Sequence, residues 1–158
     1  VVKGSCDGSV SDWVAHNIVD FETSAFEFAA GFNGYIRCHA AAKPAIEELL
    51  SIWASQDLLH LVISYAGCYV PRYVRGSAPA GSAGHSTKDS VDVDGLSNHS
   101  FGSAFDINAT QNWLGDMPAL CGRKGAVREL VAAANQCKFY WGGHYVTRKD
   151  GMHFEMTK

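Results

Sequence analysis

Hydrophobic residues recur three and four positions apart in two parts of the chain. The first part runs from His39 to Ser55, and its Pro44 stands where a first helical turn tolerates proline. The second part runs from Lys124 to Gln136. This spacing predicts two helices, each with one apolar face turned toward the core. The residues of these faces are Ala42, Ala45, Ile46, Leu49, Leu50 and Trp53 in the first helix, and Val127, Leu130, Val131 and Ala134 in the second.

Short apolar or alternating runs predict strands in other parts of the chain. Residues 58–65 are apolar, partly β-branched and stop before Gly67, which favours a buried strand. Residues 102–108 and 152–156 alternate between hydrophobic and polar positions, and a brief β-like run ends at Cys38. Together with the two helices, these strands predict an α+β fold: a single domain with a small antiparallel sheet and flanking helices.

Other segments lack a regular period. Residues 11–28 predict loops with one short helix, and Trp141-Gly142-Gly143 has the composition of a turn. Residues 75–95 are rich in Gly, Ser and Asp, so we expect a long surface loop that shapes a cleft. The interpretation that follows is an N-terminal extension over residues 1–30 and one folded domain over residues 31–158.

The alternation within two of the predicted strands separates an apolar face from a polar one. Alternate side chains of a strand share a face. If Phe105 and Ile107 face the core, Asp106 lies on the opposite face. In the last strand Phe154 belongs to the apolar face, which leaves His153 on the other side. If the two strands pair in one sheet, Asp106 and His153 point toward a common cleft.

Composition limits the range of functions. The chain has 158 residues, about the size of one domain, and 47% of them are hydrophobic against 18% charged, as in a globular protein. The 13 Lys and Arg against 16 Asp and Glu give a net charge of −3, so we expect no nucleic-acid partner. Apolar runs are interrupted by residues such as His60 and Ser64, which predicts no membrane span. We expect a monomer.

The N-terminal residues and the cysteines give weaker information. Residues 1–5 lack the charged start and apolar centre of a signal peptide, so we expect that none exists or that it was removed. None of the five cysteines shows C-x-x-C spacing, which argues against a zinc finger or a thioredoxin-type redox motif. Free thiols and up to two internal disulfides both remain open.

Two histidines and an aspartate form a candidate metal site. His99, Asp106 and His153 suffice for a catalytic zinc, because three protein ligands leave the fourth tetrahedral position open for water. His99 precedes Asp106 by an odd number of residues, and Gly102 offers the bend that would bring it to the same face. Asp150 could reach the metal-activated water as general base. Taken singly, each of these residues also fits a structural role.

The order of these residues resembles the zinc peptidases of the M15 family. The resemblance covers most of the chain from Cys38 to Met156. It is carried by Ser97-x-His99-x-x-Gly102-x-Ala104-x-Asp106, by Trp141-Gly142-Gly143, by Asp150-x-x-His153-Phe154-Glu155, and upstream by Gly67-x-Tyr69-Val70-Pro71-Arg72. The family includes D-alanyl-D-alanine carboxypeptidases, dipeptidases and L-alanyl-D-glutamate endopeptidases, among them phage endolysins. The resemblance implies a hedgehog or DD-peptidase-like fold, a zinc cofactor and peptidoglycan stem peptides as substrate.

The resemblance also implies roles for particular residues. His99, Asp106 and His153 match the zinc ligands, and Asp150 matches the catalytic Glu or Asp that acts as general base. Arg72 matches the arginine that meets the substrate carboxylate or polarises the scissile carbonyl, a role that suits a permanently charged guanidinium. A peptidase of this kind would act outside the cell, in the periplasm or at the cell wall, and could be phage-encoded.

Several weaker assignments accompany these. Ser97 matches a substrate-contacting serine of the dipeptidase branch, and a simple turn serine fits equally well. His144 follows the Trp-Gly-Gly turn, where a loop residue could contact substrate. Glu155 could orient a metal ligand or be an exposed strand carboxylate. Arg75 competes with Arg72 for the substrate role.

Two other readings stay open. A binding module could keep the metal and lose catalysis, since the signalling domain of hedgehog proteins resembles this fold. Two histidines and one aspartate also form the facial triad of non-haem iron oxygenases, although those enzymes more often have a short His-x-Asp spacing.

Overall fold

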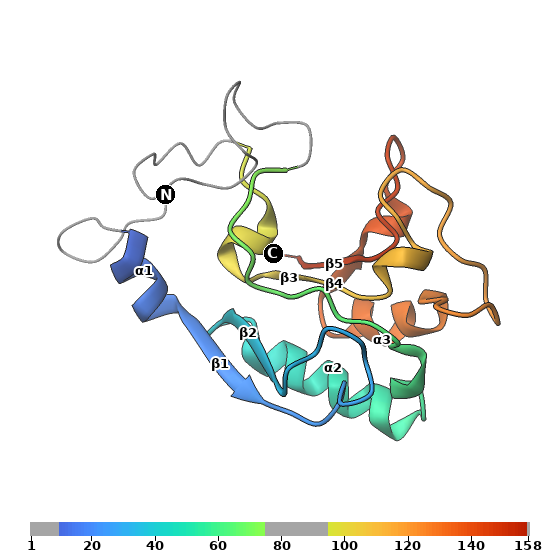
Figure 1. Cartoon of the computed structure of the whole chain (residues 1–158), viewed down its shortest axis with the longest axis horizontal. Helices are drawn as coiled ribbons and strands as arrows, with labels where there is room; N and C mark the ends of the chain where they lie inside the picture. Colours follow the sequence, from blue (N-terminus) through green and yellow to red (C-terminus); the bar gives the residue numbers. More distant parts are fainter. Residues whose placement is uncertain (1–9, 75–94, 158) are drawn as a thin grey trace.

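The computed structural model describes residues 10–74 and 95–157. Short helices and two antiparallel sheets make up an α+β fold, as predicted, with two small sheets in place of one (Figure 1). In chain order the helices and strands are α1 (Val10–Asn17), β1 (Ile18–Glu22), β2 (Tyr35–His39), α2 (Lys43–Ser55), β3 (Ala104–Asp106), α3 (Val131–Gln136), β4 (Phe139–Trp141) and β5 (His153–Met156). Five single 3-10 turns, η1 to η5, connect them at Leu59–Leu61, Asn98–Phe101, Ala109–Gln111, Arg128–Leu130 and Gly142–His144.

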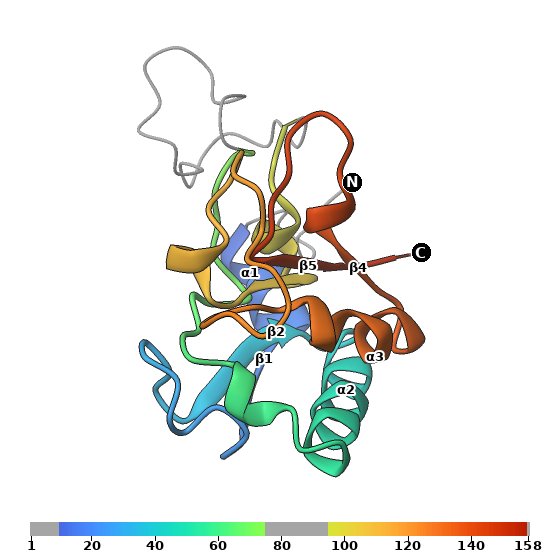
Figure 2. The same cartoon turned by 90° about the vertical axis from the view of Figure 1, so that its right-hand side faces the viewer.

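The three-stranded sheet carries the residues predicted to be functional. Its order is β3-β5-β4, with both pairs antiparallel, and Asp106 on β3 lies opposite His153 on β5. Helix α2 lies below this sheet in both views (Figures 1 and 2). The Trp53 ring of α2 packs edge-on against Phe105 and Phe154, at 6.3 Å from each ring centroid. The apolar faces predicted for the strands therefore do meet the core, which leaves Asp106 and His153 on the other face.

The two-stranded sheet joins the N-terminal residues to this core. Strands β1 and β2 pair from Ile18 opposite His39 to Glu22 opposite Tyr35. Sequence reasoning expected only loops and a short helix over residues 11–28 and thus missed β1. Phe21 and Phe26 belong to the same buried cluster as the apolar face of α2. Part of the segment interpreted as an extension thus packs into the core, while the boundary at residue 30 stays a prediction.

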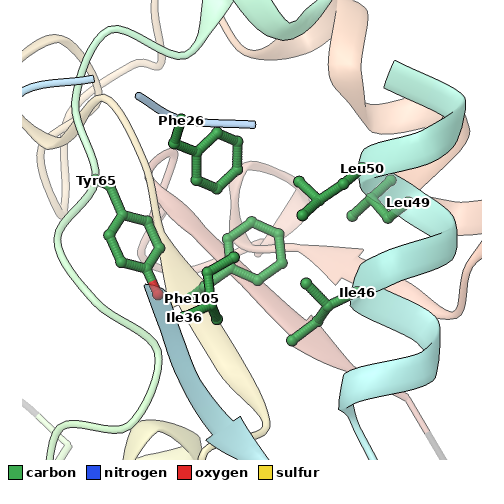
Figure 3. Close-up of a pocket in the computed structure, with 7 residues that line it drawn as sticks. All are labelled: Phe26, Ile36, Ile46, Leu49, Leu50, Tyr65 and Phe105. Atoms are coloured by element: carbon green, nitrogen blue, oxygen red, sulfur yellow. The ribbon is translucent and has the colours of Figure 1, made fainter. Parts of the chain in front are cut away.

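A small hollow remains inside the core, between α2 and the sheets (Figure 3). Its cavity volume is about 10 Å³, roughly the room that one water molecule needs. The lining side chains are apolar except for the hydroxyl group of Tyr65, which is buried without a hydrogen-bond partner among the described residues. They are Phe26, Ile36, Ile46, Leu49, Leu50, Tyr65 and Phe105. Because almost all of its lining is hydrocarbon, this hollow belongs to the packing of the core and is no place for a polar substrate.

Two predicted elements are corrected by the structure. Residues 58–65 form no strand: they contain the η1 turn, and only Ser64 and Tyr65 make isolated bridges. The backbone of this segment bonds instead to the side chain of Asn108, whose oxygen accepts from Ile63 N (2.9 Å) and Ser64 N (3.1 Å). The helix predicted for 124–136 is reduced to η4 and α3, because Gly125 has a positive φ of 76° that breaks the start of a helix.

Other predicted elements differ from the structure only in the residues at which they begin or end. Helix α2 begins at Lys43 rather than at His39, because His39 ends strand β2, and Pro44 lies in the first turn as expected. Trp141 ends strand β4, and the predicted turn is the 3-10 turn that follows it. The loop expected at 75–95 lies outside the described residues, apart from Gly95.

The structure also bears on disulfide bonds and on membrane-spanning helices. Cys38, Cys68, Cys121 and Cys137 are free thiols, and Cys6 lies outside the described residues. Burial raises the pKa of Cys38 to about 12, so this thiol stays protonated near neutral pH. Over residues 10–74 and 95–157, no helix is long and apolar enough to cross a membrane.

Asn108 is the main polar support of the fold behind the site. It is fully buried, and its amide also donates to Leu61 O (2.8 Å) and Gly125 O (3.2 Å). Replacement Asn108→Ala would leave four backbone groups, buried or partly buried, without these partners, so we expect a loss of roughly 2–5 kcal/mol in the free energy of unfolding. Urea denaturation followed by fluorescence measures it. The exposed Asn33→Ala serves as control and should change stability by less than about 0.5 kcal/mol. Equal stability of the two variants would contradict this account.

Candidate metal centre

A tight turn directs His99 toward the sheet. Ser97 caps the η2 turn with its hydroxyl oxygen, which accepts from His99 N at 3.4 Å. Gly102 ends the turn in the left-handed region at φ 64°, where a side chain would approach His39 N to 2.5 Å. The bend predicted at Gly102 is thus present, and it reverses the chain between η2 and β3. His99 and Asp106 consequently face the same side.

Three side chains converge at this point. His99 Nε2 lies 3.1 Å from Asp106 Oδ1 and 3.1 Å from His153 Nδ1, and His153 Nδ1 lies 3.0 Å from Asp106 Oδ1. Their exposed fractions are 1%, 6% and 6%. Ligand atoms around a tetrahedral zinc, each about 2.0–2.1 Å from the ion, stand roughly 3.3 Å apart. The spacing of these three atoms is close to that of one face of such a tetrahedron.

The outer nitrogens of both histidines are held by acceptors. His99 Nδ1 lies 2.9 Å from the carbonyl oxygen of Cys68, and His153 Nε2 lies 3.3 Å from Glu155 Oε2. Since neither oxygen can donate, each of these nitrogens carries the proton of its ring. In the neutral rings, His99 Nε2 and His153 Nδ1 then present lone pairs to each other and to the Asp106 carboxylate. Three converging acceptors require a cation, so the residues present fit a metal ion.

The pKa shifts show the same demand for positive charge. Burial lowers the pKa of His153, but hydrogen bonds to Asp106 and Glu155 raise it to about 9. Burial would raise the pKa of Asp106, but its hydrogen bonds with His153 and His99 hold that pKa well below its usual range. In the absence of a metal ion, His153 therefore tends to hold a second proton, which supplies positive charge at the position that a metal ion would occupy.

Arg72 lies beside the carboxylate of Asp106, a candidate metal ligand. Its Nη2 is 3.5 Å from Asp106 Oδ2, and its side chain is 21% exposed. Ser100 fixes the backbone of Arg72, because the serine hydroxyl accepts from Arg72 N (2.8 Å) and donates to Arg72 O (2.7 Å). The guanidinium thus lies at a set position on the wall of the site. Arg75, the competing arginine, lies outside the described residues.

Asp150 is held by the turn after β4. Its backbone nitrogen donates to Gly142 O at 3.0 Å, and its carbonyl oxygen accepts from His153 N at 3.1 Å. Gly142 packs so closely that a Cβ there would lie 2.5 Å from Asp150 O and 3.1 Å from Asp150 Cβ. This contact places Asp150 one turn before His153 on the rim of the same site.

A cleft with a volume of about 260 Å³ opens over these residues. Four of the predicted site residues line it: Arg72, Ser97, Asp150 and His153. The described residues add Val74, Leu96, Asn98, Leu114, Tyr145, Arg148 and Glu155. The cleft is therefore polar and charged around the metal centre, with a few apolar side chains along its walls.

Of the predicted substrate-binding residues Arg72, Ser97 and His144, only His144 does not line this cleft. Its side chain is exposed and lies against the rings of Tyr140 and Trp141. The adjacent Tyr145 lines the cleft instead, and its hydroxyl donates to Glu155 Oε1 at 2.8 Å. Sequence reasoning selected the histidine for its chemistry, and nothing in the local pattern indicated which of the two neighbours turns inward.

Fold and site together define an α+β protein with a buried candidate metal centre at the base of a cleft. Residues 91–156 match the M15 peptidase family model described as D-alanyl-D-alanine carboxypeptidase. The match covers less than half of the 158 residues and includes His99, Asp106, Asp150 and His153 but not Arg72. No curated protein and no solved structure matches the chain. The family match supports a peptidase related to peptidoglycan carboxypeptidases, as the sequence resemblance implies.

Metal binding can be tested directly on the protein. We expect one Zn²⁺ per chain by elemental analysis, removable by a chelator. His99→Ala, and separately Asp106→Ala, should abolish the stoichiometric metal, because two donors and water hold zinc far more weakly than three. His16→Ala, an exposed histidine outside the cluster, is the matched control. Retention of one zinc by both cluster variants would contradict the assignment.

Proposed function

We propose that this protein is a zinc-dependent metallopeptidase that hydrolyses the stem peptides of peptidoglycan. The observation that carries the proposal is the convergence of three acceptor atoms in a cleft also lined by Asp150 and Arg72. The match to a D-alanyl-D-alanine carboxypeptidase family supports it independently. Either the terminal D-Ala-D-Ala bond or the internal L-Ala-D-Glu bond is the scissile one under this proposal.

His99, Asp106 and His153 would hold the zinc ion, which when bound lowers the pKa of a water molecule and polarises a carbonyl oxygen. Asp150 then serves as the general base, since this residue lines the cleft together with His153. It accepts a proton from the attacking water and returns that proton to the leaving amine nitrogen. Without this transfer the nitrogen would have to depart as an unstable amide anion.

Arg72 supplies fixed positive charge on the same cleft wall. A guanidinium stays charged at all relevant pH values and pairs with carboxylates through two N–H groups. It would hold the terminal carboxylate of a carboxypeptidase substrate, or stabilise the negative charge that develops on the scissile carbonyl oxygen. Its contact with Asp106 Oδ2 keeps it close to the place where bond cleavage would occur.

The remaining details of the proposal concern fold and location. The proposal also assigns a hedgehog or DD-peptidase-like fold to the protein. The antiparallel pairing of β3 with β5 suits a site built from one segment with His99 and Asp106 and another with Asp150 and His153. A peptidoglycan substrate would place the protein outside the cell, in the periplasm or at the cell wall. Asp150 and Arg72 in the cleft favour a catalyst over a metal-retaining binding module, which would need neither.

Digestion of purified peptidoglycan tests the activity. We expect the zinc-loaded protein to release either single D-alanine or free stem peptides, and mass spectrometry distinguishes these products. Asp150→Asn should keep its zinc and lose at least about 100-fold in kcat/KM, because an amide cannot accept the proton.

The exposed Asp57→Asn is the control for loss of a carboxylate and should retain full activity. Metal analysis distinguishes zinc from the iron of an oxygenase. A zinc-loaded protein that cleaves neither bond would favour the binding module, and full turnover by Asp150→Asn would exclude Asp150 as the base.

Gly142 gives a separate test of the position of Asp150. In Gly142→Ala the added methyl group would have to displace the Asp150 backbone, since it would lie 2.5 Å from the carbonyl oxygen. We expect kcat to fall roughly 10- to 100-fold, because shifts of about 1 Å cost that much in positioned catalysis. Zinc content should not change.

Gly34→Ala is the control, because its Cβ would meet nothing within 4 Å even though its φ of 97° is strained. This variant should lose some thermal stability and keep its kcat. A Gly142→Ala enzyme with normal kcat would show that close packing at Gly142 does not position Asp150.

A further inference from the structure

We propose that Glu155 is a positioning residue, which together with Tyr145 and Asn98 holds the His153 imidazole in the orientation and tautomer that bind the metal. The inference rests on the metal centre of the proposed function and does not depend on which peptide bond is cut. It assigns a purpose to a carboxylate that the proposed hydrolysis leaves unused.

Both oxygens of Glu155 are engaged by neighbours. Oε1 accepts from the hydroxyl group of Tyr145 at 2.8 Å. Oε2 accepts from the side-chain amide of Asn98 and lies 3.3 Å from His153 Nε2. A carboxylate has two oxygens with two lone pairs each, so it can accept all of these hydrogen bonds at once. Glu155 therefore connects the η2 turn, strand β5 and the loop after β4.

The backbone position of Glu155 is set from both sides. Strand β5 is the central strand of its sheet, and Glu155 lies opposite Ala104 on β3 and Tyr140 on β4. His153 and Glu155 are two residues apart on this strand, so their side chains share a face. The Glu155 side chain is 22% exposed, against 8% for His153. Its carboxylate thus lies on the outer side of the imidazole, away from the three converging donor atoms.

This arrangement determines which ring nitrogen faces the metal position. A proton on Nε2 is stabilised by Glu155, which leaves the lone pair on Nδ1, the atom 3.0 Å from Asp106 Oδ1. Without Glu155, the hydrogen bond that holds the proton on Nε2 would be lost, and the ring could exchange tautomers. Tyr145 and Asn98 act one step further out, because they stop the carboxylate from rotating away from the ring.

Two substitutions at Glu155 separate positioning from charge. In Glu155→Gln the amide oxygen can accept from His153 and Asn98, while the amide nitrogen can donate to the Tyr145 oxygen, so every contact is kept and the charge is lost. In Glu155→Ala all of the contacts disappear. Tyr145→Phe removes only the donor to Oε1. Tyr140→Phe is its control, because Tyr140 lies opposite Glu155 and stacks on Tyr145, yet its hydroxyl group makes no hydrogen bond to Glu155 among the described residues.

The test measures Zn²⁺ affinity by competition with a chromophoric chelator, together with the visible spectrum of the Co²⁺-loaded protein. We expect Glu155→Ala to raise the Kd for Zn²⁺ by 10- to 100-fold, as is usual for the partners of metal-ligating histidines. Glu155→Gln should stay within about fivefold of the wild type and keep its Co²⁺ bands. Tyr145→Phe should weaken binding by a few-fold, and Tyr140→Phe should not change it.

Nitrogen-15 NMR of the histidine rings in the metal-free protein, recorded at a pH above the raised pKa of His153 (about 9) so that the ring is neutral, gives a readout that involves neither metal nor substrate. The wild type and Glu155→Gln should show His153 protonated on Nε2, and Glu155→Ala should show a mixture of tautomers. Wild-type Zn²⁺ affinity in Glu155→Ala, or equal losses in the Ala and Gln variants, would overturn the positioning role. Failure of the wild type to cleave peptidoglycan would instead count against the proposed function, since none of these measurements requires turnover.

Discussion

The site depends on one electrostatic constraint: three hydrogen-bond acceptors are buried within about 3 Å of one another. His99 Nε2, His153 Nδ1 and Asp106 Oδ1 converge because β3 and β5 pair with Asp106 opposite His153, and because the turn ended by Gly102 directs His99 to the same point. Such an arrangement is costly without positive charge. A metal ion would satisfy it, and the raised pKa of His153 shows that a proton also could.

The scaffold behind the site provides the rigidity that this arrangement needs. Trp53 of α2 packs on Phe105 and Phe154, the core-facing neighbours of Asp106 and His153, so the strands that carry two of the donors are anchored from below. Asn108 anchors the chain that follows β3 by bonding to four backbone groups. Asp106 and His153 are therefore positioned by apolar packing beneath their strands, and the segment after β3 is held by the hydrogen bonds of Asn108.

The order of residues predicted much of the site but less of the structure around it. Alternation placed Asp106 and His153 on the polar face, and the strand pair bears this out. Strand β1 was missed because it is stabilised by pairing with β2. The conformation of residues 58–65 was missed because it depends on Asn108, which lies more than forty residues further along the chain than Ile63 and Ser64, whose backbone it binds. Tyr145 was missed in favour of His144, since the inward turn of one neighbour depends on its contact with Glu155.

The sequence by itself determined the class of fold, the apolar faces and the residue types that could bind a metal, because these follow from periodicity and side-chain chemistry. Only the tertiary structure decided which nitrogen of each histidine faces inward, that Arg72 contacts Asp106, and that Glu155 is held by Tyr145 and Asn98. The physical reason is distance along the chain. Local patterns specify which way a side chain leaves its strand, whereas a partner contributed by a remote segment is known only once the chain has folded.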